Sequence, residues 1–250
     1  MARREGARRV NPSPPRVVVP GAALVAGAEV PFGAEEVRHA RSRRLSDGDA
    51  VVLLDGAGGR AAGLLTGGGT AARVVALLPG RGEPTVRLTV ALAAAEPARV
   101  EWAIEKGTEC GAAAFLLFVA ERSQSAHVRA LSARLERLRR IAAEAAKQCD
   151  RSSVPPVEGP FDLPTAIGAL PAPLLFALPG ARRLDPAAFA AGGAGTLLVG
   201  PEGGLAPPEA DALEAGGGVA AGLGPRVLRL ETAVVAALTL ALSPLEPGEG

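Results

Sequence analysis

From residue 86 onward, short apolar runs alternate with segments of helical pattern, and this alternation limits the chain to very few folds. The apolar runs are VRLTVALA, AAFLLFVA, PLLFALP and TLLVG, at residues 86–93, 113–120, 173–179 and 196–200. Helices are predicted at residues 98–111, 128–148, 207–215 and 231–242. Strands that alternate with helices form a mainly parallel sheet covered on both faces. The sequence therefore predicts an α/β fold here.

The helix predicted at residues 128–148 carries an apolar stripe in steps of three and four residues. The members of the stripe are Val128, Leu131, Leu135, Leu138, Ile141 and Ala145. Burial of this stripe leaves four arginines free to point outward or sideways: Arg134, Arg137, Arg139 and Arg140.

The N-terminal third has a different pattern, in which short β-type runs are separated by Gly and Asp-Gly turns. These runs are RVVVP, AVVLLDG, AAGLLTG and ARVVALLPG, at residues 16–20, 50–56, 61–67 and 72–80. Such spacing is typical of a small β-barrel. Residues 1–15 lack periodicity and are interpreted as a disordered tail. The PGRGEP stretch at residues 79–84 is interpreted as a linker.

Charge is distributed unevenly along a nearly neutral chain. The net charge is +1, which by itself gives no signal for or against a nucleic acid partner. Residues 3–44 nevertheless hold nine arginines against four glutamates, and residues 122–151 hold eight basic against three acidic residues. Either these stretches bind a polyanion locally or they are two solvated faces.

Several classes of protein are excluded by what the chain lacks. Cys110 and Cys149 stand alone, which predicts neither a zinc site nor a disulfide framework. His39 and His127 have no Ser or carboxylate constellation around them, so no hydrolase triad is predicted. The N-terminus has no apolar signal region, and the apolar run at residues 233–242 is too short to span a bilayer. We therefore expect a cytoplasmic protein without membrane or metal.

Two loops near the C-terminus carry the chemistry. Residues 196–209 (TLLVGPEGGLAPPE) run from a strand into a Gly-rich loop, and residues 222–233 (GLGPRVLRLETA) run from a short strand and loop into a helix. Gly-rich turns at strand ends let a ligand approach the backbone closely. Two such loops together predict a pocket for one small ligand. Alternatively they are ordinary connections, with Arg226 and Arg229 paired to Glu231 or Glu202.

The order of these motifs resembles the RsmE family, bacterial methyltransferases that modify N3 of a uridine in 16S ribosomal RNA. GPEGG followed by LGPRVLRLET, at residues 200–204 and 223–232, is the most specific part of the resemblance. Upstream, VEWAIEKGTECGA, AERS and RLERLRRIAAEAAKQCDRSSVPPV follow in the family's order. The resemblance extends more weakly to RVVVP and to the stretch RHA…RRL…GDAVVLLDG, so it covers nearly the whole chain from residue 16.

The resemblance implies two domains and a cofactor. Residues 16–82 would form a PUA-like β-barrel that helps hold RNA. Residues 83–250 would form a SPOUT-type domain whose C-terminal segment is tucked through a loop as a trefoil knot, one of the few exceptions to unknotted connections. S-adenosylmethionine would lie in the knot. The protein would be a homodimer, with its site completed near the subunit interface, and 16S rRNA or the small ribosomal subunit would be its partner.

The resemblance also assigns residues to roles. S-adenosylmethionine is expected to contact Ala177, Leu178, Gly200, Pro201, Glu202, Gly203, Gly204, Leu223, Gly224, Arg226, Val227, Leu228 and Thr232. RNA is expected to contact Arg16, Arg43, Arg44, Arg122, Arg134 and Arg137, although Arg122 alternatively closes the dimer.

Two residues are expected in the catalytic site. Arg229 would stabilise the anion that develops on the uracil ring as N3 loses its proton. Glu231 either accepts that proton or holds Arg229 in place, and we favour the second role. The base itself is not identified.

Two residues depart from the family pattern. Glu96 stands where Lys or Arg is expected, with Arg99 nearby, and Ala206 replaces the Ser that caps the helix after GPEGG. They motivate one alternative, an inactive RNA-binding scaffold of the same fold. A ribose 2′-O-methyltransferase is the other alternative, ranked lower.

Two further interpretations concern the helix predicted at residues 98–111. Trp102 is interpreted as a core residue. Glu101, Glu105 and Glu109 are interpreted as a solvated or Lys106-adjacent face rather than as acid–base partners.

Overall fold

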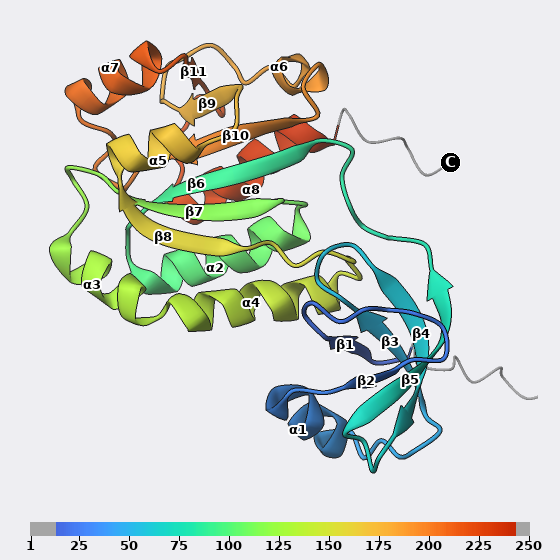
Figure 1. The fold of residues 1–250 in the computed structure, drawn as a ribbon. Helices are drawn as coiled ribbons and strands as arrows, with labels where there is room; N and C mark the ends of the chain where they lie inside the picture. Colours follow the sequence, from blue (N-terminus) through green and yellow to red (C-terminus); the bar gives the residue numbers. More distant parts are fainter. Residues whose placement is uncertain (1–13, 244–250) are drawn as a thin grey trace, which may run out of the picture. The chain divides into compact units, whose positions relative to one another are not determined.

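The chain forms two compact units, each with its own sheet (Figure 1). The computed structural model describes residues 14–243. Residues 14–55 and 59–79 form the N-terminal unit, and residues 56–58 and 80–243 form the C-terminal unit. The tail predicted over residues 1–15 lies, up to residue 13, outside the described residues.

The N-terminal unit is a five-stranded sheet with strand order β1-β3-β4-β5-β2. Its elements are β1 (Arg16–Val18), β2 (Glu29–Pro31), α1 (Ala34–Ser42), β3 (Ala50–Leu54), β4 (Arg60–Thr66) and β5 (Ala71–Leu78). Strand β1 pairs parallel with β3, and the other pairs are antiparallel. Val17, Leu53 and Leu65 belong to its core. The four predicted runs are all strands, whereas β2 and α1 have no counterpart in the sequence prediction.

The C-terminal unit is built on a six-stranded sheet with strand order β11-β9-β10-β6-β7-β8. Its strands are β6 (Arg87–Ala93), β7 (Ala114–Val119), β8 (Val157–Asp162), β9 (Leu174–Ala177), β10 (Ala194–Val199) and β11 (Val219–Ala221). Every pairing in this sheet is parallel. The α/β prediction is therefore confirmed.

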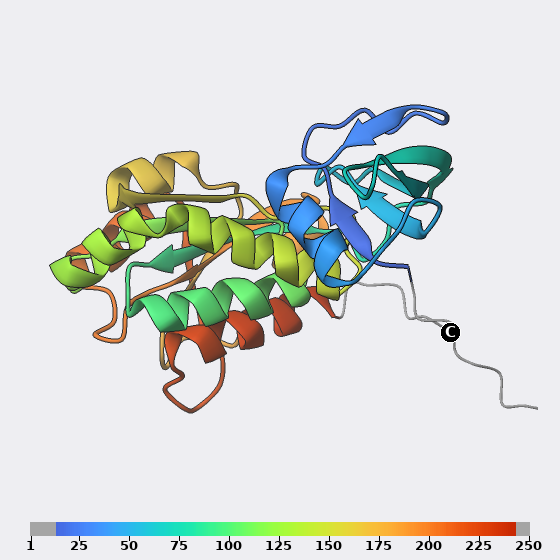
Figure 2. The same ribbon diagram turned by 90° about the horizontal axis from the view of Figure 1, so that it is seen from below.

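Helices cover both faces of this sheet (Figure 1). They are α2 (Pro97–Glu109), α3 (Ser125–Ala133), α4 (Leu135–Gln148), α5 (Leu163–Ala169), α6 (Ala187–Ala190), α7 (Pro207–Ala215) and α8 (Leu230–Leu242). Seen from below, α4, α2 and α8 lie side by side on one face (Figure 2), and α5 and α7 lie on the other. Strand β6 shows why both faces are apolar, because Leu88 and Val90 belong to one core and Ala91 and Ala93 to the other.

The structure corrects three predictions of local structure. The helix expected at residues 128–148 is two helices, since the backbone leaves helical geometry at Arg134 (φ −110°, ψ 9°). The short strand expected within residues 222–228 lies just before them, as β11. Trp102 is 43% exposed and is not a core residue.

Candidate functional site

A cavity of about 130 Å³ lies where three neighbouring strands end. Strands β11, β9 and β10 are adjacent in the parallel sheet, so their carboxyl ends meet at one edge. The residues that follow β9, the loop at 200–205 after β10 and the loop at 222–228 after β11 surround the cavity. Ligands bind at such edges of parallel sheets because several loops converge there.

Most of the residues expected to hold a cofactor line this one cavity. They are Ala177, Leu178, Gly200, Pro201, Glu202, Gly204, Leu223, Gly224, Arg226, Val227 and Leu228. Gly203 and Thr232 are not part of the lining. The two loops therefore belong to a common site, as their composition predicts.

The sequence analysis missed five residues of the lining. These are Pro179, Val199, Leu205, Leu230 and Ala233. Val199, Leu230 and Ala233 are also buried in the main core, and an apolar pattern identifies a core residue without telling which core residues border a cavity. The position of Val199 directly before GPEGG is the one signal that points to it.

The backbone of both loops depends on glycine. Gly204 has φ +71° and Gly224 has φ +123°, conformations that residues with a Cβ rarely adopt. The Gly204 amide donates a 2.8 Å hydrogen bond to the carbonyl of Pro201, which closes a tight turn beneath the cavity. Backbone and apolar side chains thus form most of the surface that a ligand would meet.

The loop at residues 222–228 is anchored at its start by backbone hydrogen bonds. The Gly222 amide donates to the carbonyl of Arg182 at 2.7 Å, and the Leu184 amide donates to the carbonyl of Gly222 at 2.9 Å. The Leu178 amide donates to the carbonyl of Ala221 at 3.0 Å. Beyond this anchor, Val227 is 83% exposed although it lines the cavity, so this side of the site is open to solvent.

The loop at residues 200–205 is held from the opposite side by Arg122, which follows β7. Its Nη1 donates to the carbonyl of Gly203 at 2.7 Å and to that of Leu205 at 3.4 Å. A Cβ added to Gly203 would lie 3.3 Å from the Arg122 side chain, so the two segments are in close contact. Arg122, expected to bind RNA, therefore contacts a loop of the cavity.

Helix α7 begins with half of a capping box. Ala206 is the N-cap and offers no side-chain oxygen, but the Glu209 carboxylate accepts the Ala206 amide at 2.8 Å. The other oxygen of Glu209 accepts the Glu121 amide at 2.8 Å. Pro207 and Pro208 occupy the first helical turn, where a missing N–H costs nothing. As predicted, the helix therefore lacks the hydrogen bond to an N-cap hydroxyl, but it keeps the other bond of a capping box, from the N-cap amide to Glu209.

Arg99 gathers three carboxylates beside the cavity. Its Nε lies 2.9 Å from Glu96 Oε2 and 3.5 Å from Glu202 Oε1, and its Nη1 lies 3.5 Å from Glu231 Oε1. The hydrogen bond to Glu96, with the two further carboxylates, raises the pKa of Arg99. Arg99 thereby joins the start of α2, the loop at residues 200–205 and the start of α8. The sequence indicated only its proximity to Glu96.

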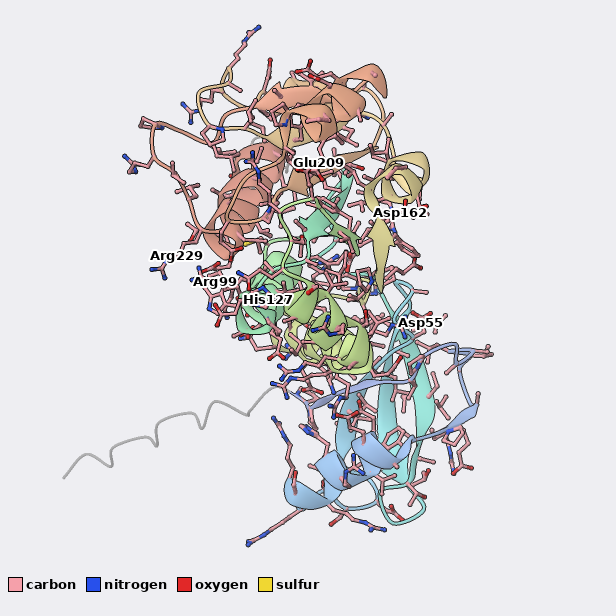
Figure 3. The ribbon with its side chains drawn as sticks, turned by 90° about the vertical axis from the view of Figure 1, so that its left-hand side faces the viewer. Asp55, Arg99, His127, Asp162, Glu209 and Arg229 are labelled. Atoms are coloured by element: carbon pink, nitrogen blue, oxygen red, sulfur yellow. The ribbon has the colours of Figure 1, made fainter. Side chains whose placement is uncertain are left out.

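The two residues expected in catalysis are not paired with each other. Within residues 14–243, the ion-pair partner of Glu231 is Arg99, and Arg229 has no ion pair. Arg229 is exposed at the N-cap of α8 and extends outward from the edge of the molecule (Figure 3). Glu231 Oε2 is buried and has no hydrogen-bond partner in this part of the chain. No contact in the described residues supports the idea that Glu231 holds Arg229.

The basic stretch at residues 122–151 is largely engaged within the protein. Arg137 forms a forked pair with Glu101, at 2.7 and 2.8 Å, and Arg134 lies 3.6 Å from the same carboxylate. This pairing lowers the pKa of Glu101. Arg151 is buried, donating to the carbonyls of residues 108 and 112 and pairing with Glu83. Arg137 is exposed, as expected, but it is paired with Glu101 and so is not free.

Other candidate residues fall into structural roles. Lys106 contacts Glu105 and Glu109, as the interpretation of that helix face predicts. Burial raises the pKa of the Cys110 and Cys149 thiols, which makes them poor nucleophiles. Residues 14–243 contain no cluster of three potential metal-ligating His, Cys, Asp or Glu side chains. None of the helices formed by these residues is long and apolar enough to cross a membrane.

Residues 82–242, which form the parallel sheet and its edge cavity, match the family model described as an RNA methyltransferase domain, and residues 32–74 match the RNA methyltransferase PUA domain. These two matches define the class of protein: RNA methyltransferases that carry a PUA domain. The chain belongs to the ribosomal RNA small subunit methyltransferase E family.

Individual relatives agree with this membership. The chain is similar to ribosomal RNA small subunit methyltransferase E of Mycobacterium tuberculosis, with 36% identity over 223 residues and 85% of each chain covered. The Synechocystis protein of the same name is 32% identical, covering 79% of this chain and 67% of the other. Among solved structures, methyltransferase E from Neisseria gonorrhoeae bound to S-adenosyl methionine has a TM-score of 0.82 at 28% identity, covering 90% of this chain and 95% of the other.

Proposed function

We propose that this protein is an S-adenosylmethionine-dependent methyltransferase that modifies N3 of a uridine in 16S ribosomal RNA. The observation that carries the proposal is the cavity at the ends of β9, β10 and β11, lined by both motif loops. Its relatives are named small subunit rRNA methyltransferases, and the Neisseria gonorrhoeae relative was solved with S-adenosyl methionine.

The residues of the cavity fit this cofactor. Leu178, Leu205, Leu223 and Leu228 supply apolar surface for an adenine ring, and the glycine backbones leave room for close approach. Glu202, which lines the cavity, places negative charge beside a ligand that carries a positive sulfonium. Arg99 holds the Glu202 carboxylate in place and also pairs with Glu231, which lies outside the lining. When bound, the cofactor supplies an activated methyl group, so catalysis by this chain consists largely of orienting two bound reactants.

We propose that Arg229 binds the uracil. It is exposed at the start of α8, next to the loop that lines the cavity, and it has no ion pair within residues 14–243. A guanidinium beside a ring carbonyl stabilises the negative charge that develops as N3 loses its proton. Glu231 acts through its contact with Arg99, which fixes the start of α8 relative to α2.

The remaining features of the proposal concern the whole protein. Residues 16–82 form an RNA-binding PUA-like domain, and residues 83–250 form the methyltransferase domain with its C-terminal trefoil knot. The protein works in the cytoplasm as a homodimer. Its RNA contacts include Arg16, Arg43, Arg44, Arg122, Arg134 and Arg137.

Calorimetry and methyl mapping test the proposal. We expect purified protein to bind S-adenosylmethionine and to transfer a labelled methyl group to 16S rRNA or to small subunits from cells that lack the gene. Nuclease digestion and mass spectrometry should place the methyl group on uracil N3. A methyl group on ribose would instead support 2′-O-methylation. RNA binding without methyl incorporation would support the inactive scaffold. Glu96 and Ala206 give this alternative less support in the folded protein, because Glu96 accepts a hydrogen bond from Arg99 and the Ala206 amide donates one to Glu209.

A further inference from the structure

Two separate contacts tie the turn after β7 to the loop that lines the cavity. Arg122 donates to the carbonyls of Gly203 and Leu205. The second contact also has its donor in the turn: the Glu121 amide donates to the carboxylate of Glu209, at the start of α7, and the other oxygen of that carboxylate accepts the Ala206 amide. Within residues 120–123 the Ala120 amide also donates to Ser123 Oγ at 3.2 Å, which stabilises the turn itself. The turn is therefore joined to the loop by the Arg122 side chain and to the start of α7 by the Glu209 side chain.

These contacts act on the backbone that a ligand would meet. Gly200, Glu202, Gly204 and Leu205 all line the cavity, and the carbonyls that Arg122 holds flank Gly204 directly. The loop contains glycines, including Gly204 at φ +71°, so its conformation is costly in entropy unless other groups hold it. A loop that is already ordered binds its ligand more tightly, because less ordering remains to be done on binding.

We propose that Arg122 is a positioning residue, which with Glu209 holds the loop at residues 200–205 in the conformation that binds the methyl donor. This inference rests on the proposed function, since it assigns the loop to the cofactor. It is a role in addition to the RNA contact proposed above for Arg122. Because α3 begins directly after this turn, the same contacts connect the cofactor loop to the exposed surface of α3.

Arg122→Ala tests the proposal in the full-length protein. We expect the affinity for S-adenosylmethionine, measured by calorimetry, to fall about tenfold, because hydrogen bonds from a charged donor are lost. The KM for the cofactor should rise in the same proportion while kcat changes less. Hydrogen exchange at the Gly204 amide should accelerate without ligand, as the loop opens more often. Thermal unfolding should stay near that of the wild type, because the Arg122 side chain is exposed.

Two further variants separate positioning from RNA binding. Arg122→Lys keeps the positive charge but loses the guanidinium Nη1 that donates both hydrogen bonds, so cofactor affinity should recover only in part while RNA affinity stays at the wild-type level. Glu209→Gln places an amide N–H opposite the backbone N–H of Glu121 or of Ala206, so one of these two hydrogen bonds is lost and cofactor binding should weaken. Its effect should not add fully to that of Arg122→Ala, because both variants loosen the same loop. Arg129→Ala removes an exposed arginine on α3 and serves as the control, with cofactor affinity unchanged.

The outcomes distinguish the two proposals. Normal cofactor affinity and normal exchange at Gly204 in Arg122→Ala, with wild-type protein that binds the cofactor, would overturn the positioning role alone. Loss of RNA affinity with unchanged cofactor binding would return Arg122 to the RNA interface. Wild-type protein that fails to bind S-adenosylmethionine would overturn the proposed function and, with it, the inference about the loop.

Discussion

At Ala206 an N-cap side chain without a hydroxyl is tolerated, because neighbouring residues satisfy part of the helix end. A side-chain oxygen at an N-cap satisfies one free amide of the first helical turn, and Ala206 cannot supply it. Glu209 still accepts the Ala206 amide, and two prolines remove amides that would otherwise need partners. The helix therefore begins at the residue where the sequence predicts it.

Ala206→Ser should restore the missing cap. We expect the free energy of unfolding, measured in urea, to rise by about 0.5–1 kcal/mol, since a hydroxyl at this position bonds a free amide. Affinity for S-adenosylmethionine should stay within about twofold by the arithmetic of binding free energy. No stabilisation would mean that Glu209 and the prolines already satisfy this helix end.

Arg229→Ala should reduce turnover far more than cofactor binding. Removing a donor to a developing oxyanion lowers kcat by about a hundredfold or more, while calorimetry should give nearly wild-type cofactor affinity. Arg182→Ala, which removes another exposed arginine of the same unit, is the matched control and should keep full activity. Equal losses in both variants would argue against a specific role for Arg229.

Glu231→Gln distinguishes a proton acceptor from a positioning residue. Because Glu231 pairs with Arg99, we expect a loss of roughly tenfold in kcat/KM, comparable to one charged hydrogen bond. The pH–rate profile should keep its wild-type shape. Arg99→Ala should give a similar loss, and the double variant should be little worse than either. A loss of more than about a thousandfold with an altered pH profile would instead assign the proton transfer to Glu231.

At the level of elements, an ion-pair cluster spans helices α2 and α4, above the apolar core that they share. Glu101 of α2 accepts two hydrogen bonds from Arg137 of α4, and Arg134 stands between α3 and α4 near the same carboxylate. The sequence pattern correctly predicts the apolar stripe beneath these residues, with Leu131 and Leu138 fully buried. It does not predict the break at Arg134, because the stripe itself continues through it.

The Glu101 pairing predicts a pH dependence of stability. Arg137 lowers the pKa of Glu101 in the folded protein, while in the unfolded chain the pKa of a glutamate is about 4.3. The contribution is therefore complete above that value and is lost as the pH falls through the lower folded pKa. Compared with Glu101→Gln, the wild type should be more stable by about 1 kcal/mol at neutral pH, and the difference should shrink in acid. A difference that is independent of pH would contradict the ion pair.

At the scale of the whole molecule, two units with different tasks are expected to share one RNA. The predicted basic contribution of the N-terminal unit includes Arg43 and Arg44, which are exposed after α1. In the C-terminal unit, much of the basic stretch is neutralised internally, since Arg137 and Arg151 pair with Glu101 and Glu83. We therefore expect the N-terminal unit to make a larger share of the phosphate contacts than the number of basic residues in each unit would indicate.

Changing Arg43 and Arg44 together to Ala tests this division of tasks. RNA affinity should fall, and the slope of log affinity against log salt should decrease by about 1–2, since each lost phosphate contact removes nearly one unit. Cofactor affinity should not change. Arg134→Ala should affect the salt slope less. An unchanged slope in the Arg43 and Arg44 variant would exclude this surface from the RNA interface.

Local pattern alone was sufficient for the parallel sheet, for helices α7 and α8 and for the pairing of the two Gly-rich loops in one cavity. Each depends on a property of neighbouring residues: apolar periodicity, a proline in the first turn, or a glycine that permits positive φ. Strand β8 and helix α5 were missed because residues 157–169 mix Gly and Pro with apolar residues. Trp102 was misplaced because an aromatic side chain in an apolar helix is usually buried.

The fold class follows from the periodicity of the sequence, and the family and most of the cavity lining follow from the resemblance of contiguous motifs to a known family. Which charged groups meet is visible only in the folded chain: Arg99, and not Arg229, pairs with Glu231, and Arg122 donates to the carbonyls of Gly203 and Leu205. Arginine side chains are long and flexible, so their partners depend on which distant segments the folded backbone brings within a few ångströms.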